Sequence, residues 1–234
     1  MLIHGAANSA KVWPFWQREL AQRGWLTYAV DLRGHGQSEV AELGATTMAD
    51  YAADVRTLIH QLAQPPLLIG WSMGGLVAMM VAATDVVAGC VGLAPSLPAR
   101  RLDDSVALRQ GTFGAEEYGI ISRNPDEQPA MPDLDREERL IALASLGPES
   151  RLARDERKRG IVIEKLGCPL LLVTGSDDRQ WPSEQYAGLW LQADRLVADG
   201  ASHWGLVLNR RALSKTIPSV VDWMVRAAVG LGKI

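Results

Sequence analysis

The chain has 234 residues, of which 47% are apolar and 22% charged, and its formal net charge is −3. This composition excludes a chain that is disordered throughout, and the length favours a single domain. The net charge gives no support for nucleic-acid binding. No apolar run approaches about 18 residues, so we expect no membrane span. The two cysteines fit a reducing compartment, and no apolar signal segment follows Met1, so we expect a cytoplasmic protein.

Short apolar segments alternate with helical patterns along the chain. Strands are predicted at 2–3, 26–32, 66–70, 86–94, 169–175 and 195–198, and helices at 13–22, 47–63, 73–84 and 209–229. Thr47 is the predicted N-cap of the second helix, with Asp50 three residues later, and a bend is expected at Pro218 in the last helix. Because helices separate the strands, the pattern predicts a parallel sheet covered on both faces.

Residues 96–165 interrupt this alternation. They hold 26 of the 51 charged residues, with helical patches at 134–146 and 150–160 and no clear strand. We interpret the segment as an inserted helical cap with a solvated outer face, between core segments 1–95 and 166–234. The alternative is a surface excursion with no role in catalysis.

A sharp turn around Ser72 carries the strongest chemical signal. Gly70-Trp71-Ser72-Met73-Gly74 matches the pattern G-x-S-x-G, with a predicted strand before it and a predicted helix after it. Glycines on both sides allow the backbone to turn tightly, so that the serine hydroxyl projects from the sheet edge. The alternative is a chance Gly/Ser turn.

With this turn in its context, the sequence from His4 to about Trp223 resembles the α/β-hydrolase family. The resemblance implies a three-layer α/β fold, in which a mostly parallel sheet has helices on both faces and carries an inserted cap. In that family the turn is the nucleophile elbow, and the catalytic residues follow in the order serine, acid, histidine. Ser72 is therefore the candidate nucleophile.

The family order selects the base and the acid. His203 follows the last predicted strand, where the family has its catalytic histidine; a capping histidine is the alternative. The segment 175–182 resembles the family pattern G-x-x-D-x-x-x-P, which selects Asp178 as the residue that orients this base. Asp177, one residue earlier, stays open as a second candidate.

The resemblance also suggests roles for backbone groups and for the other histidines. The backbone N–H groups of Met73 and Ala6 are the candidate oxyanion donors, with Ala7 as a less favoured alternative to Ala6. We expect His4 to support the oxyanion turn and His35 to be structural. His60 lies in a helical pattern and is expected at the surface or in packing.

Tryptophan is unusually frequent, with eight residues against two phenylalanines. Trp71 precedes the candidate nucleophile and is predicted to line the substrate pocket. For Trp13, Trp181 and Trp204, core packing is the favoured explanation. Trp204, next to the candidate base, is kept beside Trp71 as a candidate substrate-binding residue.

One expected departure from the family concerns the start of the sheet. Family members usually have two strands before the strand that ends in His-Gly. Because His4 lies almost at the start of this sequence, we expect this N-terminal hairpin to be missing, either in the natural protein or because the start of the sequence is displaced. The strand at 26–32 would then become a sheet edge. Since an apolar edge invites pairing with another chain, we expect a homo-oligomer formed through this edge.

The resemblance implies a serine hydrolase that cleaves carboxylic esters of small to medium size through an acyl-enzyme. The turn is similar to that of carboxylesterases, pimeloyl-carrier-protein methyl esterases and perhydrolases. Alternatives are a carbon–carbon bond hydrolase or lyase with the same triad, and a non-catalytic ligand-binding member. The expected partner is a small-molecule ester, with no nucleic acid and no membrane. We expect no cofactor and no metal, because no His/Asp/Glu cluster has ligand spacing.

Overall fold

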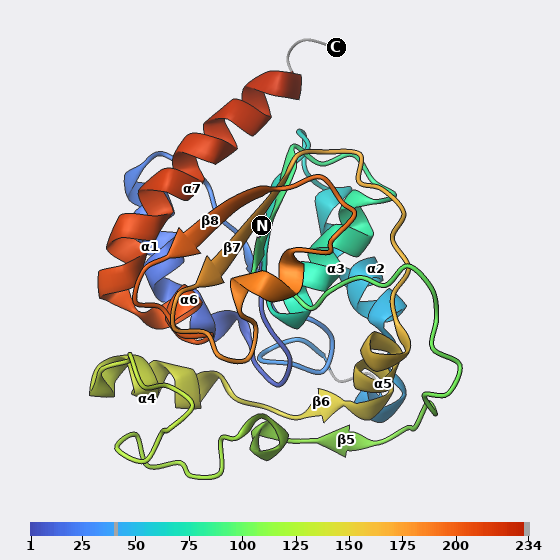
Figure 1. Cartoon of the computed structure of the whole chain (residues 1–234), viewed down its shortest axis with the longest axis vertical. Coiled ribbons are helices and arrows are strands. Elements are labelled where there is room, and N and C mark those ends of the chain that lie inside the picture. The colour runs from blue at the N-terminus through green and yellow to red at the C-terminus, as the bar shows by residue number, and fades with distance from the viewer. Residues whose placement is uncertain (40–41, 232–234) are drawn as a thin grey trace.

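The computed structural model describes residues 1–39 and 42–231, and its centre is a parallel sheet (Figure 1). Six strands follow the order β2-β1-β3-β4-β7-β8, and each neighbouring pair is parallel. This confirms the predicted mostly parallel α/β fold. The strands are β1 (Leu2–Ile3), β2 (Ala29–Val30), β3 (Leu67–Trp71), β4 (Gly89–Leu93), β7 (Leu170–Gly175) and β8 (Asp194–Ala198).

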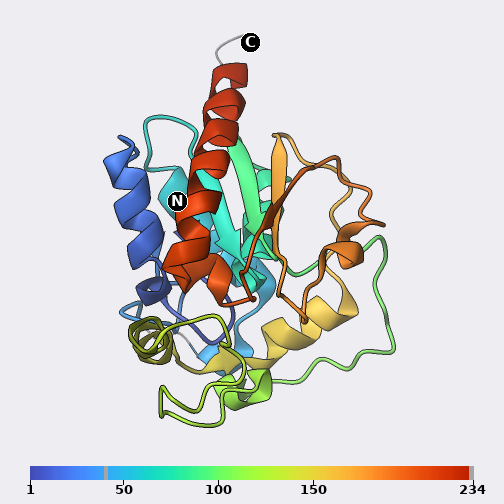
Figure 2. The same ribbon diagram turned by 60° about the vertical axis from the view of Figure 1, so that its left-hand side comes forward.

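Helices cover both faces of this sheet (Figures 1 and 2). One face packs against α1 and α7, and the other against α2 and α3. Successive residues of β3 point to opposite faces: Leu67 and Ile69 join the α1/α7 core, and Leu68 joins the α2/α3 core. The helices of this part are α1 (Pro14–Gln22), α2 (Met48–Ile59), α3 (Met73–Ala82), α6 (Gly205–Leu208) and α7 (Arg210–Leu231).

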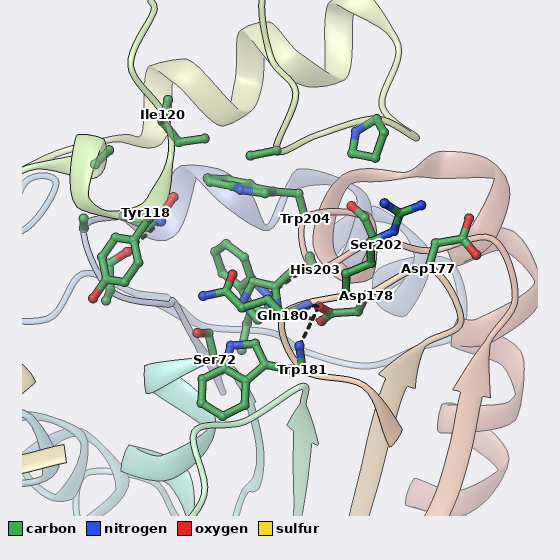
Figure 3. Close-up of a pocket in the computed structure, with 18 of the residues that line it drawn as sticks. Ser72, Tyr118, Ile120, Asp177, Asp178, Gln180, Trp181, Ser202, His203 and Trp204 are labelled. Atoms are coloured by element: carbon green, nitrogen blue, oxygen red, sulfur yellow. Dashed lines mark hydrogen bonds and ion pairs between the residues drawn. The ribbon is translucent and has the colours of Figure 1, made fainter. Parts of the chain in front are cut away.

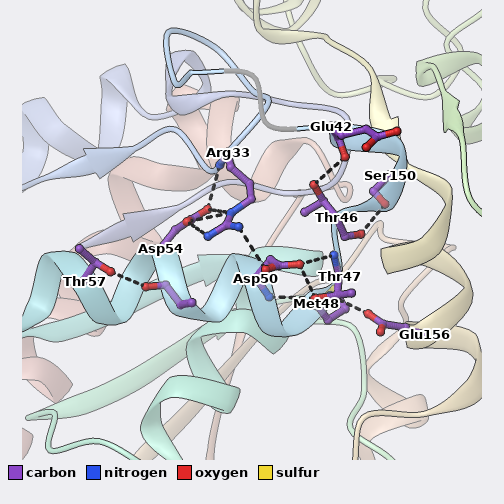
Figure 4. A network of polar contacts seen from close by, with 11 residues as sticks. Arg33, Glu42, Thr46, Thr47, Met48, Asp50, Asp54, Thr57, Ser150 and Glu156 are labelled. Carbon is purple, nitrogen blue, oxygen red and sulfur yellow. Dashed lines mark hydrogen bonds and ion pairs between the residues drawn. The ribbon is translucent and has the colours of Figure 1, made fainter.

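The start of α2 is fixed by a capping box, as predicted (Figure 4). The Asp50 N–H donates to Oγ1 of Thr47 over 3.0 Å, and the Thr47 N–H donates to Oδ2 of Asp50 over 2.9 Å. Arg33 binds both Asp50 and Asp54 of the helix, which ties the loop after β2 to this face of the sheet. The two reciprocal bonds satisfy N–H groups that a helix start leaves without partners.

The predicted strand at 26–32 is wrong in length, because only Ala29 and Val30 pair. Among the described residues β2 is an edge strand with β1 as its neighbour, and the side chain of Leu26 stays 78% exposed. A strand this short offers few free backbone groups for pairing with another chain. Self-association through this edge stays a prediction. The predicted last helix corresponds to α7, which continues through Pro218.

Segment 96–165 lies beyond the carboxyl ends of β7 and β8 (Figure 1). Its elements are β5 (Thr112–Phe113), α4 (Arg136–Ser145), β6 (Glu149–Ser150) and α5 (Arg151–Arg159). The two predicted helical patches are confirmed. The expectation that the segment has no strand is wrong, because β5 and β6 form an antiparallel pair. Two paired residues are too few to produce a recognisable alternation in the sequence. The division of the chain into core and cap domains stays a prediction.

Within residues 1–39 and 42–231, no helix combines the length and the apolarity needed to cross a membrane. The same residues contain no group of three or more His, Cys, Asp or Glu side chains placed to hold a metal ion. Cys90 and Cys168 are free thiols, and burial raises the pKa of both. A raised pKa keeps a thiol protonated, so neither cysteine is an activated nucleophile.

Candidate active site

Ser72 lies between β3 and α3, in the strand–turn–helix context that the sequence predicts. Its backbone has φ 54° and ψ −119°, a conformation that residues other than glycine rarely adopt. The turn closes because glycines surround it. A Cβ atom on Gly74 would overlap with the carbonyl oxygens of Ile3 and His4, and one on Gly70 would overlap with the carbonyl of Gly74.

His203 and Asp178 form a close pair in front of this turn (Figure 3). Nδ1 of His203 lies 2.8 Å from Oδ2 of Asp178, whose residue is 4% exposed. The other carboxylate oxygen accepts the backbone N–H groups of Gln180 at 3.0 Å and Trp181 at 2.9 Å. Burial by itself raises the pKa of the Asp178 carboxyl, but these hydrogen bonds and the imidazole hold that pKa below its ordinary value. The carboxylate is therefore ionised and fixed in orientation.

The second acid candidate has a different environment. Asp177 is exposed, and its Oδ1 accepts a hydrogen bond from the hydroxyl of Ser176 at 3.0 Å. Asp178, rather than Asp177, therefore faces the imidazole of His203.

Ser72 and His203 line the same pocket, which has a volume of about 730 Å³ (Figure 3). No hydrogen bond joins Oγ of Ser72 to the imidazole in the described part of the chain. Catalytic hydrogen bonds are commonly loose before substrate binds and tighten in the reacting complex. The pocket therefore brings the three residues predicted from the sequence to one place, with the acid–base contact already made.

Three of the four tryptophans singled out by the sequence line this pocket: Trp71, Trp181 and Trp204. The ring centroid of Trp71 lies 5.2 Å from that of His203 and 5.0 Å from that of Trp204. Trp13 instead packs in the core against α1. Core packing is thus the right explanation for Trp13, and the other three rings form a wall that can exclude water from the site.

Among the described residues, the N–H groups of the two expected oxyanion donors have no hydrogen-bond partner. Met73 is the first residue of α3, where a helix has no acceptor for its leading N–H groups. The N–H of Ala6 enters none of the hydrogen bonds found between described residues. The alternative donor, Ala7, is occupied, because its N–H donates to Oε2 of Glu149 over 2.9 Å. The geometry thus favours Ala6 over Ala7.

The other histidines lie outside the reacting groups. His4 is fully buried; its Nε2 accepts the Leu32 N–H at 3.2 Å, so its Nδ1 carries the proton and donates to the Gly5 carbonyl at 2.8 Å. Burial, with a smaller effect of His35, lowers the pKa of His4 to about 4. His4 therefore supports the turn as a neutral ring. His60 is exposed and pairs with a surface carboxylate.

Several residues of the site gave no signal in the sequence. Tyr118, Ile120 and Arg157, all from segment 96–165, line the pocket. Oδ2 of Asp133, also from this segment, accepts the N–H of Ser202 at 3.0 Å, one residue before the imidazole. These residues belong to no local motif, and they reach the site only through the tertiary fold.

Comparison with known proteins supports this description. The chain is 38% identical over 98 residues to protein phosphatase methylesterase 1 of Mus musculus, a match that covers 40% of this chain and spans only 25% of the mouse protein. It is 29% identical over 253 residues to a pimeloyl-[acyl-carrier protein] methyl ester esterase of Pectobacterium carotovorum subsp. carotovorum (strain PC1), covering 93% and 91% of the two chains.

Solved structures share the same fold. Polyneuridine aldehyde esterase has a TM-score of 0.69 at 16% identity, covering 94% of this chain and 97% of that chain. The monoacylglycerol lipase of Paleococcus ferrophilus has a TM-score of 0.67 at 23% identity, covering 97% and 93%. A family model described as "Alpha/beta hydrolase family" matches residues 1–214. The chain belongs to the alpha/beta hydrolase family.

Proposed function

We propose that the protein is a serine carboxylesterase that works through an acyl-enzyme. The observation that carries the proposal is the 2.8 Å contact between Nδ1 of His203 and the buried carboxylate of Asp178, in the pocket that Ser72 lines. A serine hydroxyl needs an adjacent base, and the base needs a carboxylate that fixes its tautomer. The names of the relatives, which include methylesterases and esterases, support the same reaction.

In the first half of the reaction, Oγ of Ser72 attacks the ester carbonyl carbon while Nε2 of His203 takes the hydroxyl proton. Asp178 accepts the Nδ1–H and stabilises the imidazolium. The carbonyl oxygen becomes an oxyanion that the N–H groups of Ala6 and Met73 bind. When the tetrahedral intermediate collapses, the C–O bond of the ester breaks, and the imidazolium gives its proton to the leaving alcohol.

In the second half, a water molecule attacks the acyl carbon, and His203 takes a proton from this water. Collapse of the second intermediate breaks the bond to Oγ of Ser72, which recovers its proton, and releases the carboxylic acid. The tryptophan wall keeps other water away from the charged intermediates and strengthens the hydrogen bonds to the oxyanion.

The size of the pocket supports small to medium esters as substrates. A volume of about 730 Å³ is typical of pockets that enclose one small organic molecule. Apolar side chains such as Ile120 and Trp204 suit an acyl chain, and the groups around Asp177 and Arg179 form a polar side. Methyl esters are the first class to test, because several relatives are named for methyl ester cleavage.

A panel of p-nitrophenyl esters from acetate to octanoate, with matching methyl esters, tests the proposal. We expect turnover of the shorter chains by the wild type, covalent labelling of Ser72 by a fluorophosphonate, and loss of both in Ser72→Ala without loss of fold. Turnover near the wild-type level in Ser72→Ala refutes the assignment of Ser72 as the nucleophile. Labelling without turnover of any ester favours a carbon–carbon bond hydrolase or lyase, and absence of both favours a ligand-binding protein.

A further inference from the structure

Glu149, in β6 of segment 96–165, is a carboxylate buried beneath residues 4–8, the candidate oxyanion loop. Its side chain has no exposed surface. Burying an ionised carboxylate is costly unless every oxygen has polar partners, so such a residue needs a physical explanation. Neither the charge pattern nor any motif of the sequence singles it out, because the surrounding segment has the composition of a solvated surface.

The partners of this carboxylate come from both the inserted segment and the core. Oε2 accepts the N–H of Ala7 at 2.9 Å, and Nε2 of His35 lies 3.5 Å from the same oxygen. Oε1 accepts the hydroxyl of Tyr51 at 2.6 Å and the N–H of Ser150 at 2.7 Å. Each oxygen therefore accepts a backbone N–H. Oε1 also accepts the hydroxyl of Tyr51, and the imidazole of His35 lies close to Oε2 without a hydrogen bond.

The contact with Ala7 acts directly on the oxyanion loop. The peptide group between Ala6 and Ala7 is held at both ends, because its carbonyl accepts the side-chain amide of Asn8 at 2.8 Å and its N–H donates to Glu149. Ala7 has φ 55°, in the left-handed region that an alanine adopts only when its surroundings impose it. Removing the acceptor would free this peptide group to rotate.

The preceding peptide group, between Gly5 and Ala6, carries the expected oxyanion donor. The carbonyl of Gly5 is bound by Nδ1 of His4 at 2.8 Å, and this leaves the N–H of Ala6 as the free end of that group. The inserted segment holds the same loop twice more. The N–H of Gly147 donates to the carbonyl of Ala7 at 3.0 Å, and the hydroxyl of Ser145 donates to the side chain of Asn8 at 2.7 Å.

We propose that Glu149 is a positioning residue for ester cleavage, which fixes the oxyanion loop through the Ala7 N–H so that the Ala6 N–H points at the oxyanion. The inference rests on the proposed function for its kinetic consequences. The inserted segment then does more than cover the pocket, because it supplies the anchor that completes the oxyanion hole.

A glutamine at position 149 leaves two donors facing each other in either orientation of its amide. With the NH₂ group against the N–H of Ala7 the anchor is lost, and the amide oxygen still accepts the Tyr51 hydroxyl and the Ser150 N–H. The reverse orientation keeps the Ala7 bond but removes the acceptor of both Tyr51 and Ser150, so the orientation that breaks the anchor is favoured. Asp155 provides a matched control. It is also a carboxylate of the inserted segment with no exposed side-chain surface, but its hydrogen bonds go to Arg109, away from the pocket.

The test compares Glu149→Gln and Asp155→Asn with the wild type on the best p-nitrophenyl ester. Loss of one oxyanion donor costs about 100- to 1000-fold in kcat, so we expect misplacement of one to lower kcat by about 10- to 100-fold. KM should stay within about threefold, because the ester binds before the oxyanion forms. The inhibition constant of a trifluoromethyl ketone, which forms an oxyanion on the enzyme, should rise in parallel with the fall in kcat. Asp155→Asn should keep kcat within about twofold.

A milder variant, Tyr51→Phe, keeps the test decisive if Glu149→Gln does not fold. It removes one hydrogen bond from Oε1 and leaves the carboxylate in place, so we expect a severalfold fall in kcat at constant KM. Unchanged kcat and unchanged inhibition in the folded variants overturn the proposal, as does a fall in kcat of the same size in Asp155→Asn.

Hydrogen exchange separates this inference from the proposed function. The amide of Ala7 should exchange faster in Glu149→Gln and Tyr51→Phe than in the wild type, and it should be unchanged in Asp155→Asn. If the wild type neither cleaves esters nor reacts with a fluorophosphonate, the proposed function fails, and exchange at Ala7 still decides whether Glu149 holds the loop. Unchanged exchange at Ala7 in both variants overturns the positioning role.

Discussion

The indole Nε1 of Trp71 donates a hydrogen bond of 3.0 Å to the carbonyl oxygen of His203. The bond joins the residue before the candidate nucleophile to the backbone of the candidate base, 132 positions later in the chain. The two rings also lie 5.2 Å apart. Trp71 therefore does two things in the pocket: it forms part of the wall, and it fixes the loop that carries the imidazole.

Trp71→Phe keeps an aromatic ring and removes this hydrogen bond. Because such a bond contributes about 1 kcal/mol, and misplacement of the base acts on the chemical step, we expect kcat to fall by about five- to tenfold. Steady-state kinetics on the best ester measure the effect. The control is Trp190→Phe, which loses a similar bond of 2.9 Å to the carbonyl of Ile163, outside the pocket. Equal losses of kcat in both variants would contradict a local role for Trp71.

The two neighbouring acids provide the second prediction. Asp178→Asn places an amide against Nδ1 of His203 and favours the wrong tautomer, so kcat should fall by about 100- to 10,000-fold. Asp177 lines the polar side of the pocket but is exposed and does not contact the imidazole, so Asp177→Asn should lower kcat far less than Asp178→Asn. The pH–rate profile of each variant completes the measurement. A larger loss of kcat in Asp177→Asn than in Asp178→Asn would show that Asp177 is the residue that orients His203.

The sequence predicts which side chains meet at the candidate site because each of them follows a strand. Ser72 follows β3, Asp178 follows β7 and His203 follows β8, and the carboxyl ends of parallel strands meet at one edge of the sheet. Strand order and helix positions are likewise encoded in local apolar patterns. The exact length of β2 is not, since pairing with β1 rather than composition decides how far a strand extends.

The residues that support and line the site from outside the three predicted side chains could not be predicted from the sequence. Glu149 and Ala7 are 142 positions apart, and no spacing rule connects them. Tyr118 and Ile120 lie in an irregular segment whose fold depends on contacts with the core. A buried carboxylate in a charged segment looks like a solvated one, because the difference is the set of partners that the tertiary structure brings to it.

The elbow glycines provide the third prediction. A Cβ atom on Gly74 would overlap with backbone carbonyls of β1 and of the oxyanion loop, which cannot move without disturbing the sheet. We expect Gly74→Ala to lower the free energy of unfolding by about 2 kcal/mol or more and to abolish turnover. Gly188 has open space around it, so Gly188→Ala should leave stability and activity unchanged. Denaturant unfolding compares the two variants, and equal stability would show that the turn is more tolerant than its geometry indicates.

The fourth prediction concerns acid stability, which depends on the buried groups under the oxyanion loop. The pKa of Glu149 falls from 4.5 to about 2, because His35, Arg157 and Tyr51 together outweigh the effect of burial, which raises it. As the pH falls, the Glu149 carboxyl is protonated in the unfolded chain before it is protonated in the folded protein. The stabilising contribution of Glu149 is therefore complete above pH 4.5 and is lost as the pH falls towards about 2.

Two histidines act in the same region with opposite signs. The pKa of His4 falls from 6.5 to about 4, so its contribution is lost as the pH falls through that window. The pKa of His35 is raised, since its contacts with Glu149 outweigh the burial that lowers it. Its contribution is therefore present at low pH and lost as the pH rises through its folded pKa. The two histidines act in different pH windows, because the window of His35 lies above pH 6.5 and that of His4 runs from 6.5 down to about 4. Of these three groups, Glu149 is therefore the one whose contribution is still being lost below about pH 4.

Denaturant unfolding of the wild type and Glu149→Gln between pH 7 and pH 3 measures this contribution. The wild type should be more stable at pH 7 than Glu149→Gln. This difference in the free energy of unfolding should shrink steadily below pH 4.5, because a protonated carboxyl, like the neutral amide, lacks the negative charge that stabilises the fold. Asp177→Asn, at an exposed carboxylate, should follow the wild type at every pH. An advantage that stays constant down to pH 3 would mean that the variant loses packing rather than a charge, and that the carboxylate of Glu149 does not hold the loop through its ionised form.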